Sequence, residues 1–274
     1  MSVPVITLNN GVEIPQLGYG TFQVAADEAQ RAVETALEAG YRHIDTAAGY
    51  YNEEGVGAAL RAVGLPREDV FVTTKVRNAD QGYEETLAAF EASRRALALD
   101  VVDLYLVHWP VPSRDRYVET WRALEKLYAE GAVRAIGVSN FLPEHLERLR
   151  AETDVLPAVN QVEVHPGFQN RAVTEASTAA GIAVEAYSPL GRGAALGKEA
   201  VTRAARDLGV TPAQVVLRWH LQQGRIVIPK SATPERIVEN VDVFGFELDE
   251  EQLAAVDALE AGERTGGDPA TFSS

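Results

Sequence analysis

The chain has 274 residues, 46% of them hydrophobic, so it can bury a sizeable core as two small domains or as one large α/β barrel. Its formal net charge of −15 opposes general attraction to nucleic acid or anionic membranes, and the lack of cysteine excludes disulfides, cysteine nucleophiles and thiolate metal sites. Without a secretory-signal pattern or a run of 18 apolar residues, the sequence predicts a soluble, cytoplasmic protein that does not act on nucleic acid or membranes.

The first predicted element is a β-hairpin. In ITLNNGVEIPQL, short apolar alternation is interrupted by Asn10 and Gly11, the dipeptide that best suits a tight hairpin turn. After this hairpin the pattern changes to strands that alternate with helices. Eight strand-like apolar runs follow, at 17–21, 41–45, 70–75, 103–108, 135–139, 158–164, 182–188 and 225–230.

Helical patterns lie between these runs. Apolar residues recur at three- and four-residue spacing in the segments 27–40, 82–100, 120–131 and 170–181. Two later helices are predicted at 211–224 and 233–241, and each begins with Thr as N-cap and Pro at the first helical position. In the first of them, Gln214 stands three residues after Thr211, which predicts a capping box.

The βα alternation favours an α/β fold. Eight short strands with apolar residues on both faces, each followed by a helix, predict a single (β/α)8 TIM barrel that forms one domain over residues 1–274. A doubly wound sheet is the alternative, but no strand is followed by G-x-G-x-x-G.

Ionisable side chains end three consecutive predicted strands. Asp45, Lys75 and His108 occupy these positions, and Tyr50 lies in the loop after the second strand. Singly, each has an ordinary structural explanation as a helix cap, a surface lysine, a core histidine or a packing tyrosine. Because barrel active sites lie at the carboxyl ends of the strands, their joint occurrence points to function.

The four side chains together suit proton transfer. Asp45 would hold the Lys75 ammonium, which would lower the pKa of Tyr50 from about 10 toward the working pH. His108 would hydrogen-bond a substrate oxygen. A tyrosine paired with lysine can protonate an alkoxide, so the chemistry required is hydride addition to a carbonyl. Since no side chain supplies hydride, a nicotinamide cofactor is implied.

Two other enzyme classes use residues of the same strands. A glycosidase would need two carboxylates, and Glu163 and Glu185 are available. A metal-dependent hydrolase could use His108 and His165, but no cluster with metal-ligand spacing is present. The glycosidase interpretation leaves the set of Asp45, Tyr50, Lys75 and His108 unexplained.

The sequence resembles a known family along nearly its whole length. The segments HIDTAAGYYNEE, TTK, LVHWP, IGVSNF, NQVEVHP, AYSPLG and IPKS with ERIVENVDVF are similar to the signature segments of the aldo-keto reductases. Details such as GYGTFQV and EEGVGAAL most resemble the bacterial 2,5-diketo-D-gluconate reductase branch. This resemblance implies NADPH-dependent reduction of an aldehyde or ketone, including keto-sugar acids, with Asp45, Tyr50, Lys75 and His108 as catalytic tetrad and Tyr50 as general acid.

The resemblance also implies a binding site for NADPH/NADP+. It places the nicotinamide carboxamide on Ser139, Asn140 and Gln161, the nicotinamide ring on Tyr187, the pyrophosphate along Ser188, Leu190 and Gly191, the 2′-phosphate on Lys230, Ser231 and Arg236, and adenine near Glu239 and Asn240. The alternative for the last group is an ordinary loop into a helix, with a surface pair of Arg236 and Glu239.

Substrate-pocket walls implied by the resemblance are Phe22, Trp109, the residues just beyond Lys75, and the C-terminal tail. The chain departs from many relatives after TTK, because VRN places Arg77 where they carry a tryptophan. Arg77 either faces the pocket, which would favour carboxylate or polyhydroxy substrates, or points to solvent. The tail AGERTGGDPATF is either mobile or a pocket cover.

A non-enzymatic role is the remaining alternative. Fold and cofactor binding do not entail turnover, so an NADPH-binding structural or regulatory protein of the same fold fits the same residues. The predicted partner in either case is a small molecule, with a carbonyl substrate for the enzyme, and the resemblance implies a monomer.

Overall fold

Eight parallel strands form one sheet in the computed structural model, which describes residues 3–273. In chain order they are β3 (Tyr19–Gly20), β4 (His43–Asp45), β5 (Phe71–Val76), β6 (Val102–Val107), β7 (Val133–Ser139), β8 (Val159–Glu163), β9 (Ala183–Tyr187) and β10 (Ile226–Val227). Each pairs in parallel with the next, and a parallel bridge between Leu17 and Val227 joins the two ends of the sheet. The sheet is therefore closed into a barrel.

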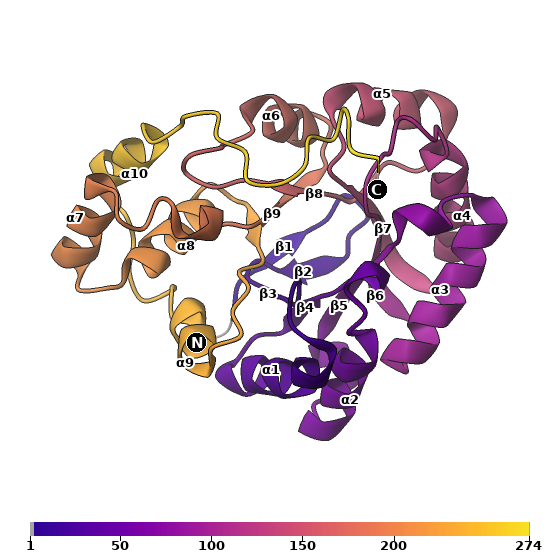
Figure 1. Ribbon diagram of the computed structural model, residues 1–274, viewed down its shortest axis with the longest axis horizontal. Coiled ribbons are helices and arrows are strands. Elements are labelled where there is room, and N and C mark those ends of the chain that lie inside the picture. The colour runs from indigo at the N-terminus through magenta and orange to yellow at the C-terminus, as the bar shows by residue number, and fades with distance from the viewer. Residues whose placement is uncertain (1–2, 274) are drawn as a thin grey trace.

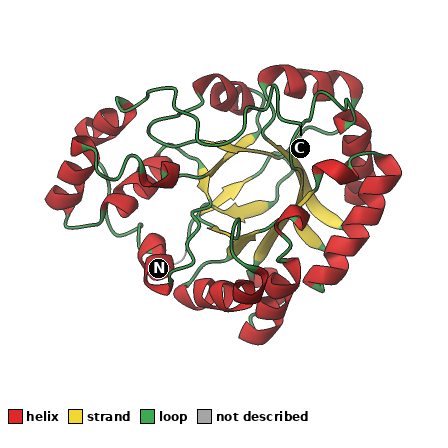
Figure 2. Ribbon diagram, viewed as in Figure 1, coloured by secondary structure: helices red, strands yellow, loops and turns green. Residues whose placement is uncertain are grey.

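Helices surround this barrel (Figures 1 and 2). They are α1 (Ala26–Ala39), α2 (Glu53–Val63), α3 (Tyr83–Leu97), α4 (Tyr117–Ala129), α5 (Pro143–Glu152), α6 (Arg171–Ala179), α7 (Glu199–Leu208), α8 (Pro212–Gln222), α9 (Pro234–Val241) and α10 (Glu250–Asp257). The predicted (β/α)8 barrel is confirmed, with α7 and α10 packed against each other as additions to the βα alternation. No helix within residues 3–273 is long and apolar enough to cross a bilayer.

The predicted hairpin closes one end of the barrel. Strands β1 (Val5–Thr7) and β2 (Glu13–Pro15) pair antiparallel, and Gly11 between them takes the positive φ of +83° that a residue without Cβ adopts most readily. Ile14 is fully buried and packs into an apolar cluster with Phe71 and Leu104 from the barrel strands. The hairpin therefore fills the end at which the strands begin, and the functional groups gather at the other.

Both predicted N-cap residues begin their helices, each followed by Pro at the first helical position. The Thr211 hydroxyl accepts a hydrogen bond from the Gln214 backbone nitrogen at 3.3 Å, and the Gln214 side-chain oxygen accepts one from the Thr211 backbone nitrogen at 2.9 Å, as in the predicted capping box. Thr233 occupies the predicted N-cap position of α9, but its side chain makes no capping bond to the helix. Its backbone nitrogen instead donates to the Ser231 hydroxyl, so local turn geometry replaces the cap.

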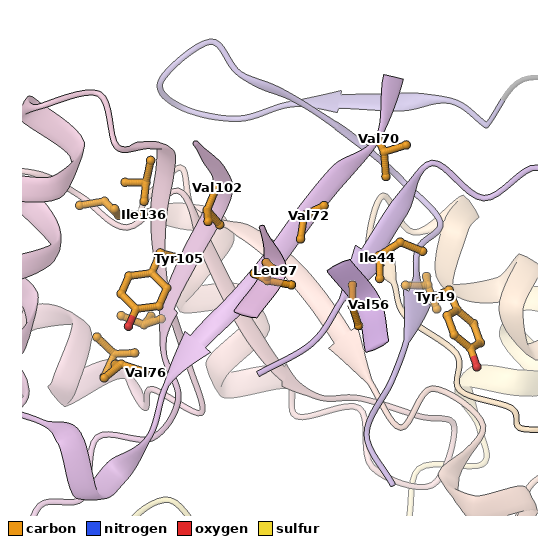
Figure 3. Close-up of a cluster of buried hydrophobic side chains, with 14 of the residues drawn as sticks. Tyr19, Ile44, Val56, Val70, Val72, Val76, Leu97, Val102, Tyr105 and Ile136 are labelled. Atoms are coloured by element: carbon orange, nitrogen blue, oxygen red, sulfur yellow. The ribbon is translucent and has the colours of Figure 1, made fainter. Parts of the chain in front are cut away.

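Strand alternation separates an apolar outer layer from a polar interior. Ile44 of β4 and Val72 of β5 point outward into the large buried cluster that also contains Val56 of α2 (Figure 3). Full burial of such a side chain is worth about 1.5–3 kcal/mol, so this layer holds the strands in place. The alternate positions, Asp45 and Lys75, are buried and meet inside the barrel.

The chain after α10 crosses the carboxyl ends of the strands (Figure 1). Glu163, the last residue of β8, anchors it by accepting bonds from the Thr265 nitrogen at 2.6 Å, the Thr265 hydroxyl at 2.6 Å and the Gly266 nitrogen at 2.9 Å. Further along, the Phe272 ring stacks on Trp109 with centroids 3.9 Å apart and planes 19° from parallel. The tail therefore lies over the barrel mouth, in contact with Glu163 and Trp109.

Burial and hydrogen bonding act in opposite directions on Glu163. Burial raises the pKa of this carboxyl, but bonds from His165, Thr265 and Gly266 outweigh it and lower the pKa to about 2. Because the folded pKa lies below the value of about 4.3 for a free glutamate, the anchor contributes stability at neutral pH and loses it as the pH falls toward 2.

Replacing this carboxylate should loosen the tail. A hydrogen bond to a charged group contributes about 1.5–3 kcal/mol against about 1 kcal/mol for a neutral one, so we expect Glu163→Gln to expose the tail roughly 10-fold more often. Tryptic cleavage after Arg264, followed by mass spectrometry at pH 7.5, measures this exposure. The surface variant Glu147→Gln is the control, and equal cleavage rates in both variants would show that Glu163 does not hold the tail.

Candidate active site

A buried ion pair stands at the centre of the site. Because Asp45 of β4 pairs with Thr73 of β5, Lys75 is the next inward-facing residue of β5 beyond that pair. Its Nζ donates to Asp45 Oδ1 at 2.7 Å, to Asp45 Oδ2 at 2.8 Å and to the Thr46 carbonyl at 2.9 Å. These contacts hold the ammonium at one point of the interior.

Tyr50 and His108 lie at this ammonium. Tyr50 ends a single 3-10 turn, Ala48–Tyr50, directly after β4, and its hydroxyl is 3.3 Å from Lys75 Nζ. His108 follows β6, and its ring centroid is 5.7 Å from that of Tyr50, edge to face. The structure therefore brings together the four side chains that the sequence singled out.

The direction of the Tyr50 shift differs from the expectation. Burial raises the pKa of Tyr50, and although Lys75 acts in the predicted direction and lowers it, the net pKa lies above the ordinary value of 10. The expectation was wrong because it counted the neighbouring charge and left out desolvation. The phenol therefore carries its proton at neutral pH.

Of the other three ionisable groups, Lys75 and His108 have charges that follow from their shifted pKa values. Burial lowers the pKa of Lys75, but Asp45 and Tyr50 outweigh burial and raise it, so the amine stays an ammonium. Burial, followed by the charge of Lys75, lowers the pKa of His108 to about 3. His108 is thus a neutral imidazole, which can donate a hydrogen bond without adding charge.

A polar cluster adjoins the ion pair. The Ser139 hydroxyl and the Asn140 nitrogen each donate to the Gln161 carbonyl at 2.9 Å, and the Asn140 side chain donates to the His108 carbonyl at 3.1 Å. Asn140 has a φ of +64°, in the left-handed region. The Tyr187 hydroxyl donates to the Asn140 side-chain oxygen at 2.8 Å. The four residues predicted around the nicotinamide are therefore linked to one another.

The loop after β9 carries the next predicted group. Ser188 and Gly191 both have positive φ, of 47° and 54°, and the Gly191 nitrogen donates to the Ser188 carbonyl at 2.8 Å. A Cβ at Gly191 would lie 2.8 Å from His165 Nδ1, so only glycine fits there without displacement. Leu190 is half-buried between two apolar clusters, which holds the turn against the barrel.

The loop after β10 presents free basic groups. Lys230 and Arg236 are exposed, and neither makes an ion pair with any residue from 3 to 273. Glu239 accepts from the Thr211 hydroxyl at 2.7 Å, so the alternative surface pair with Arg236 is not formed. The Ser231 carbonyl accepts from the Tyr19 hydroxyl at 2.6 Å, which ties the loop to the barrel. Asn240 is buried beneath it.

Two of the predicted pocket residues lie beside Tyr50 or its neighbour Gly49. Phe22 is 51% exposed, and its ring centroid is 5.1 Å from that of Tyr50. Trp109 lies under Phe272 of the tail. A Cβ at Gly49, the neighbour of Tyr50, would be 3.7 Å from Arg77 Cγ, so the Arg77 stem lies at the site. Its guanidinium pairs with Asp80 through two bonds, at 2.6 and 3.0 Å.

The two carboxylates of the glycosidase alternative are used otherwise. Glu163 binds the tail, and Glu185 is fully buried and accepts from the Gln161 side chain at 2.9 Å. Neither role was predicted, although two-residue alternation back from Tyr187 places Glu185 on the inner face of β9. Residues 3–273 contain no group of three His, Asp or Glu side chains arranged to hold a metal ion.

Known proteins are similar to this chain along nearly its whole length. The model of the Aldo/keto reductase family matches residues 16–261. An aldo-keto reductase of Mycolicibacterium smegmatis is 52% identical over 270 residues, which cover 98% of both chains. The glyoxal reductase of Bacillus subtilis is 50% identical over 265 residues, which cover 96% of this chain and 95% of the relative.

A solved structure has nearly the same fold. A mutant of Gox0644 in complex with NADPH is 46% identical to this chain, and the match covers 99% of each chain with a TM-score of 0.95. The family model matches most of the chain, and these two relatives are identical to it at about half of the aligned positions. This chain therefore belongs to the aldo/keto reductase family.

Proposed function

We propose that this chain reduces the carbonyl group of a small aldehyde or ketone to an alcohol, with NADPH as reductant and Tyr50 as proton donor. The observation that carries the proposal is the position of Lys75 Nζ, which lies 2.7 Å from Asp45 Oδ1 and 3.3 Å from the Tyr50 hydroxyl. As a member of the aldo/keto reductase family with an NADPH-bound structural relative, the chain is an NADP-dependent oxidoreductase.

The chemistry follows from the charges of the four side chains. NADPH, when bound, supplies the hydride that the carbonyl carbon receives. Tyr50 donates its phenolic proton to the carbonyl oxygen as that oxygen becomes negative, and Lys75 stabilises the phenolate that remains. Neutral His108 donates a hydrogen bond to the same oxygen. Asp45 acts indirectly, because it keeps the ammonium in place.

The residues at the barrel mouth fit the nicotinamide half of the cofactor. Ser139, Asn140 and Gln161 offer the amide and hydroxyl groups that a carboxamide requires, and Tyr187 offers an aromatic face beside them. We assign the pyrophosphate to the loop containing Ser188, Leu190 and Gly191.

The loop after β10 fits the phosphorylated end of NADPH. Lys230 and Arg236 are exposed and have no carboxylate partner within residues 3–273, so both are available to an anion. We assign them to the 2′-phosphate together with Ser231, and Glu239 and Asn240 to the adenine side. On a protein of net charge −15, two local cations of this kind favour NADPH over NADH.

For the substrate we propose small dicarbonyls and keto-sugar acids such as 2,5-diketo-D-gluconate. Two observations support this: the sequence resemblance to that reductase branch, and the Arg77 stem beside Gly49. Guanidinium has five N–H donors, of which the pair with Asp80 uses two and a bond to Tyr51 uses a further one, so two remain for a substrate carboxylate.

The first prediction concerns Tyr50. Tyr50→Phe removes the proton donor and keeps the ring, so turnover should fall by roughly 10²–10⁴-fold while NADPH affinity is preserved. NADPH consumption with a panel of aldehydes, ketones and 2,5-diketo-D-gluconate, beside fluorescence titration of NADPH, separates the two effects. If the unmodified protein binds NADPH and reduces none of these carbonyls, the non-enzymatic alternative holds.

The second prediction concerns cofactor choice. Lys230→Ala should raise the Kd for NADPH about 10-fold or more and leave that for NADH nearly unchanged, because a charge-assisted bond contributes about 1.5–3 kcal/mol. Titration of each cofactor against both proteins measures the ratio, and the exposed Lys198→Ala is the matched control. Equal losses for the two cofactors would remove Lys230 from the 2′-phosphate site.

The third prediction concerns substrate charge. In Arg77→Ala, the ratio of kcat/KM for 2,5-diketo-D-gluconate to that for a neutral aldehyde should fall about 10-fold, the equivalent of about 1.4 kcal/mol. Arg150→Ala, a change in an exposed arginine of α5, is the control for net charge. An unchanged ratio in Arg77→Ala would mean that this guanidinium serves only Asp80.

A further inference from the structure

Two buried carboxyl groups share one amide next to the catalytic lysine. Gln161 Nε2 donates to Asp45 Oδ2 at 2.8 Å and to Glu185 Oε2 at 2.9 Å. Asp45 also has both oxygens on the Lys75 ammonium. Glu185 is fully buried, and its second oxygen, Oε1, has no hydrogen-bond partner.

The groups that face Glu185 do not balance a second negative charge. Across the barrel, β4 contributes Asp45 and His43, β5 contributes Lys75, and the neighbouring strand β10 contributes only apolar Ile226 at the paired position. Among residues 3–273, Lys75 is the one cation that acts on Glu185, and Asp45 already holds it. An ionised Glu185 would therefore be a buried charge without compensation, which is costly in a low-dielectric interior.

His43 does not supply the missing cation. Its Nε2 lies 3.6 Å from Glu185 Oε1 and 3.0 Å from the Thr73 hydroxyl. Burial, followed by the charge of Lys75, lowers the pKa of His43 to about 3, so the ring is neutral. A neutral ring nitrogen can accept the O–H of a protonated carboxyl, whereas it cannot neutralise a carboxylate.

The electrostatics agree with this geometry. Burial, followed by the charge of Asp45, raises the pKa of Glu185 to about 8. When ionised, Glu185 acts on the same two groups that carry the chemistry, since its charge raises the pKa of Tyr50 and of Lys75.

We propose that Glu185 is a positioning residue that holds a proton in the working enzyme and sets the pH range over which Tyr50 can act as an acid. As a neutral carboxyl it accepts the Gln161 amide and leaves Lys75 to Asp45 and Tyr50. When it loses its proton at alkaline pH, the added negative charge near Lys75 makes Tyr50 retain its own proton. The inference rests on the proposed role of Tyr50.

The test is Glu185→Gln, which has nearly the same shape and can never ionise. Near pH 7 we expect kcat/KM for carbonyl reduction within about 3-fold of the unmodified enzyme, because a neutral side chain replaces a neutral one. At alkaline pH the variant lacks the charge that retains the Tyr50 proton. The alkaline limb of its reduction profile should therefore move to lower pH, by about half a unit to one unit.

The reverse reaction tests the same titration of Tyr50 through its phenolate form. Alcohol oxidation with NADP+ needs the Tyr50 phenolate, so the variant should become active at lower pH than the unmodified enzyme. A residue with only a packing role would lower activity at every pH and shift neither limb. The matched control is Glu53→Gln, since Glu53 is also a buried carboxyl but is bonded to Thr74 and Ser93 outside the barrel. It should leave both limbs in place.

A second measurement does not need turnover or the Glu185 variant to fold. In the Glu53→Gln background, infrared difference spectra across pH 6–10 should show a protonated carboxyl that is lost with a midpoint near 8. A carboxylate already ionised at pH 6, or unshifted alkaline limbs in an active Glu185→Gln enzyme, would overturn the inference and leave the proposed function intact. Absence of carbonyl reduction by the unmodified enzyme would instead contradict the proposed function.

Discussion

The site is organised around a lysine ammonium buried in the barrel and the carboxylate that compensates it. Moving a charge of this size out of water costs several kcal/mol, and Lys75 offsets that cost through both oxygens of Asp45 and the Thr46 carbonyl. Removing either partner would leave an unpaired buried charge, at a cost of about 3–5 kcal/mol. The ammonium contacts the Tyr50 hydroxyl, and its charge adds to burial in keeping His108 neutral. Burial and the charge of its partner Asp45 keep Glu185 protonated.

The rest of the molecule keeps the ion pair in a dry interior. Below it, the hairpin places Ile14 among apolar side chains of the barrel, and above it the tail lies across the strand ends, anchored at Glu163. Outside, the strands are held by an apolar layer against the helices (Figure 3). In such surroundings each hydrogen bond and each charge counts for more than in water, which explains how few groups determine the proton affinity of Tyr50.

Charge is distributed differently at the two ends of the expected cofactor site. Near the nicotinamide end the donors are neutral amides and hydroxyls, linked through Asn140 to the His108 backbone. At the far end, Lys230 and Arg236 have no carboxylate partner within residues 3–273, although the chain is strongly acidic. In the proposed assignment, hydrogen bonds orient the nicotinamide and exposed cations select the phosphate, so changes at one end need not disturb the other.

The local sequence pattern was sufficient to predict the barrel, the hairpin and the Thr211 cap. It also predicted that Asp45, Lys75, Tyr50 and His108 would meet. Strand period and chain order are properties of neighbouring residues, and closure of parallel strands brings their ends to one mouth. Only the tertiary structure decided the raised pKa of Tyr50 and the separate uses of Glu163 and Glu185. Desolvation and burial are sums over groups that are distant in sequence, and no local pattern contains those sums.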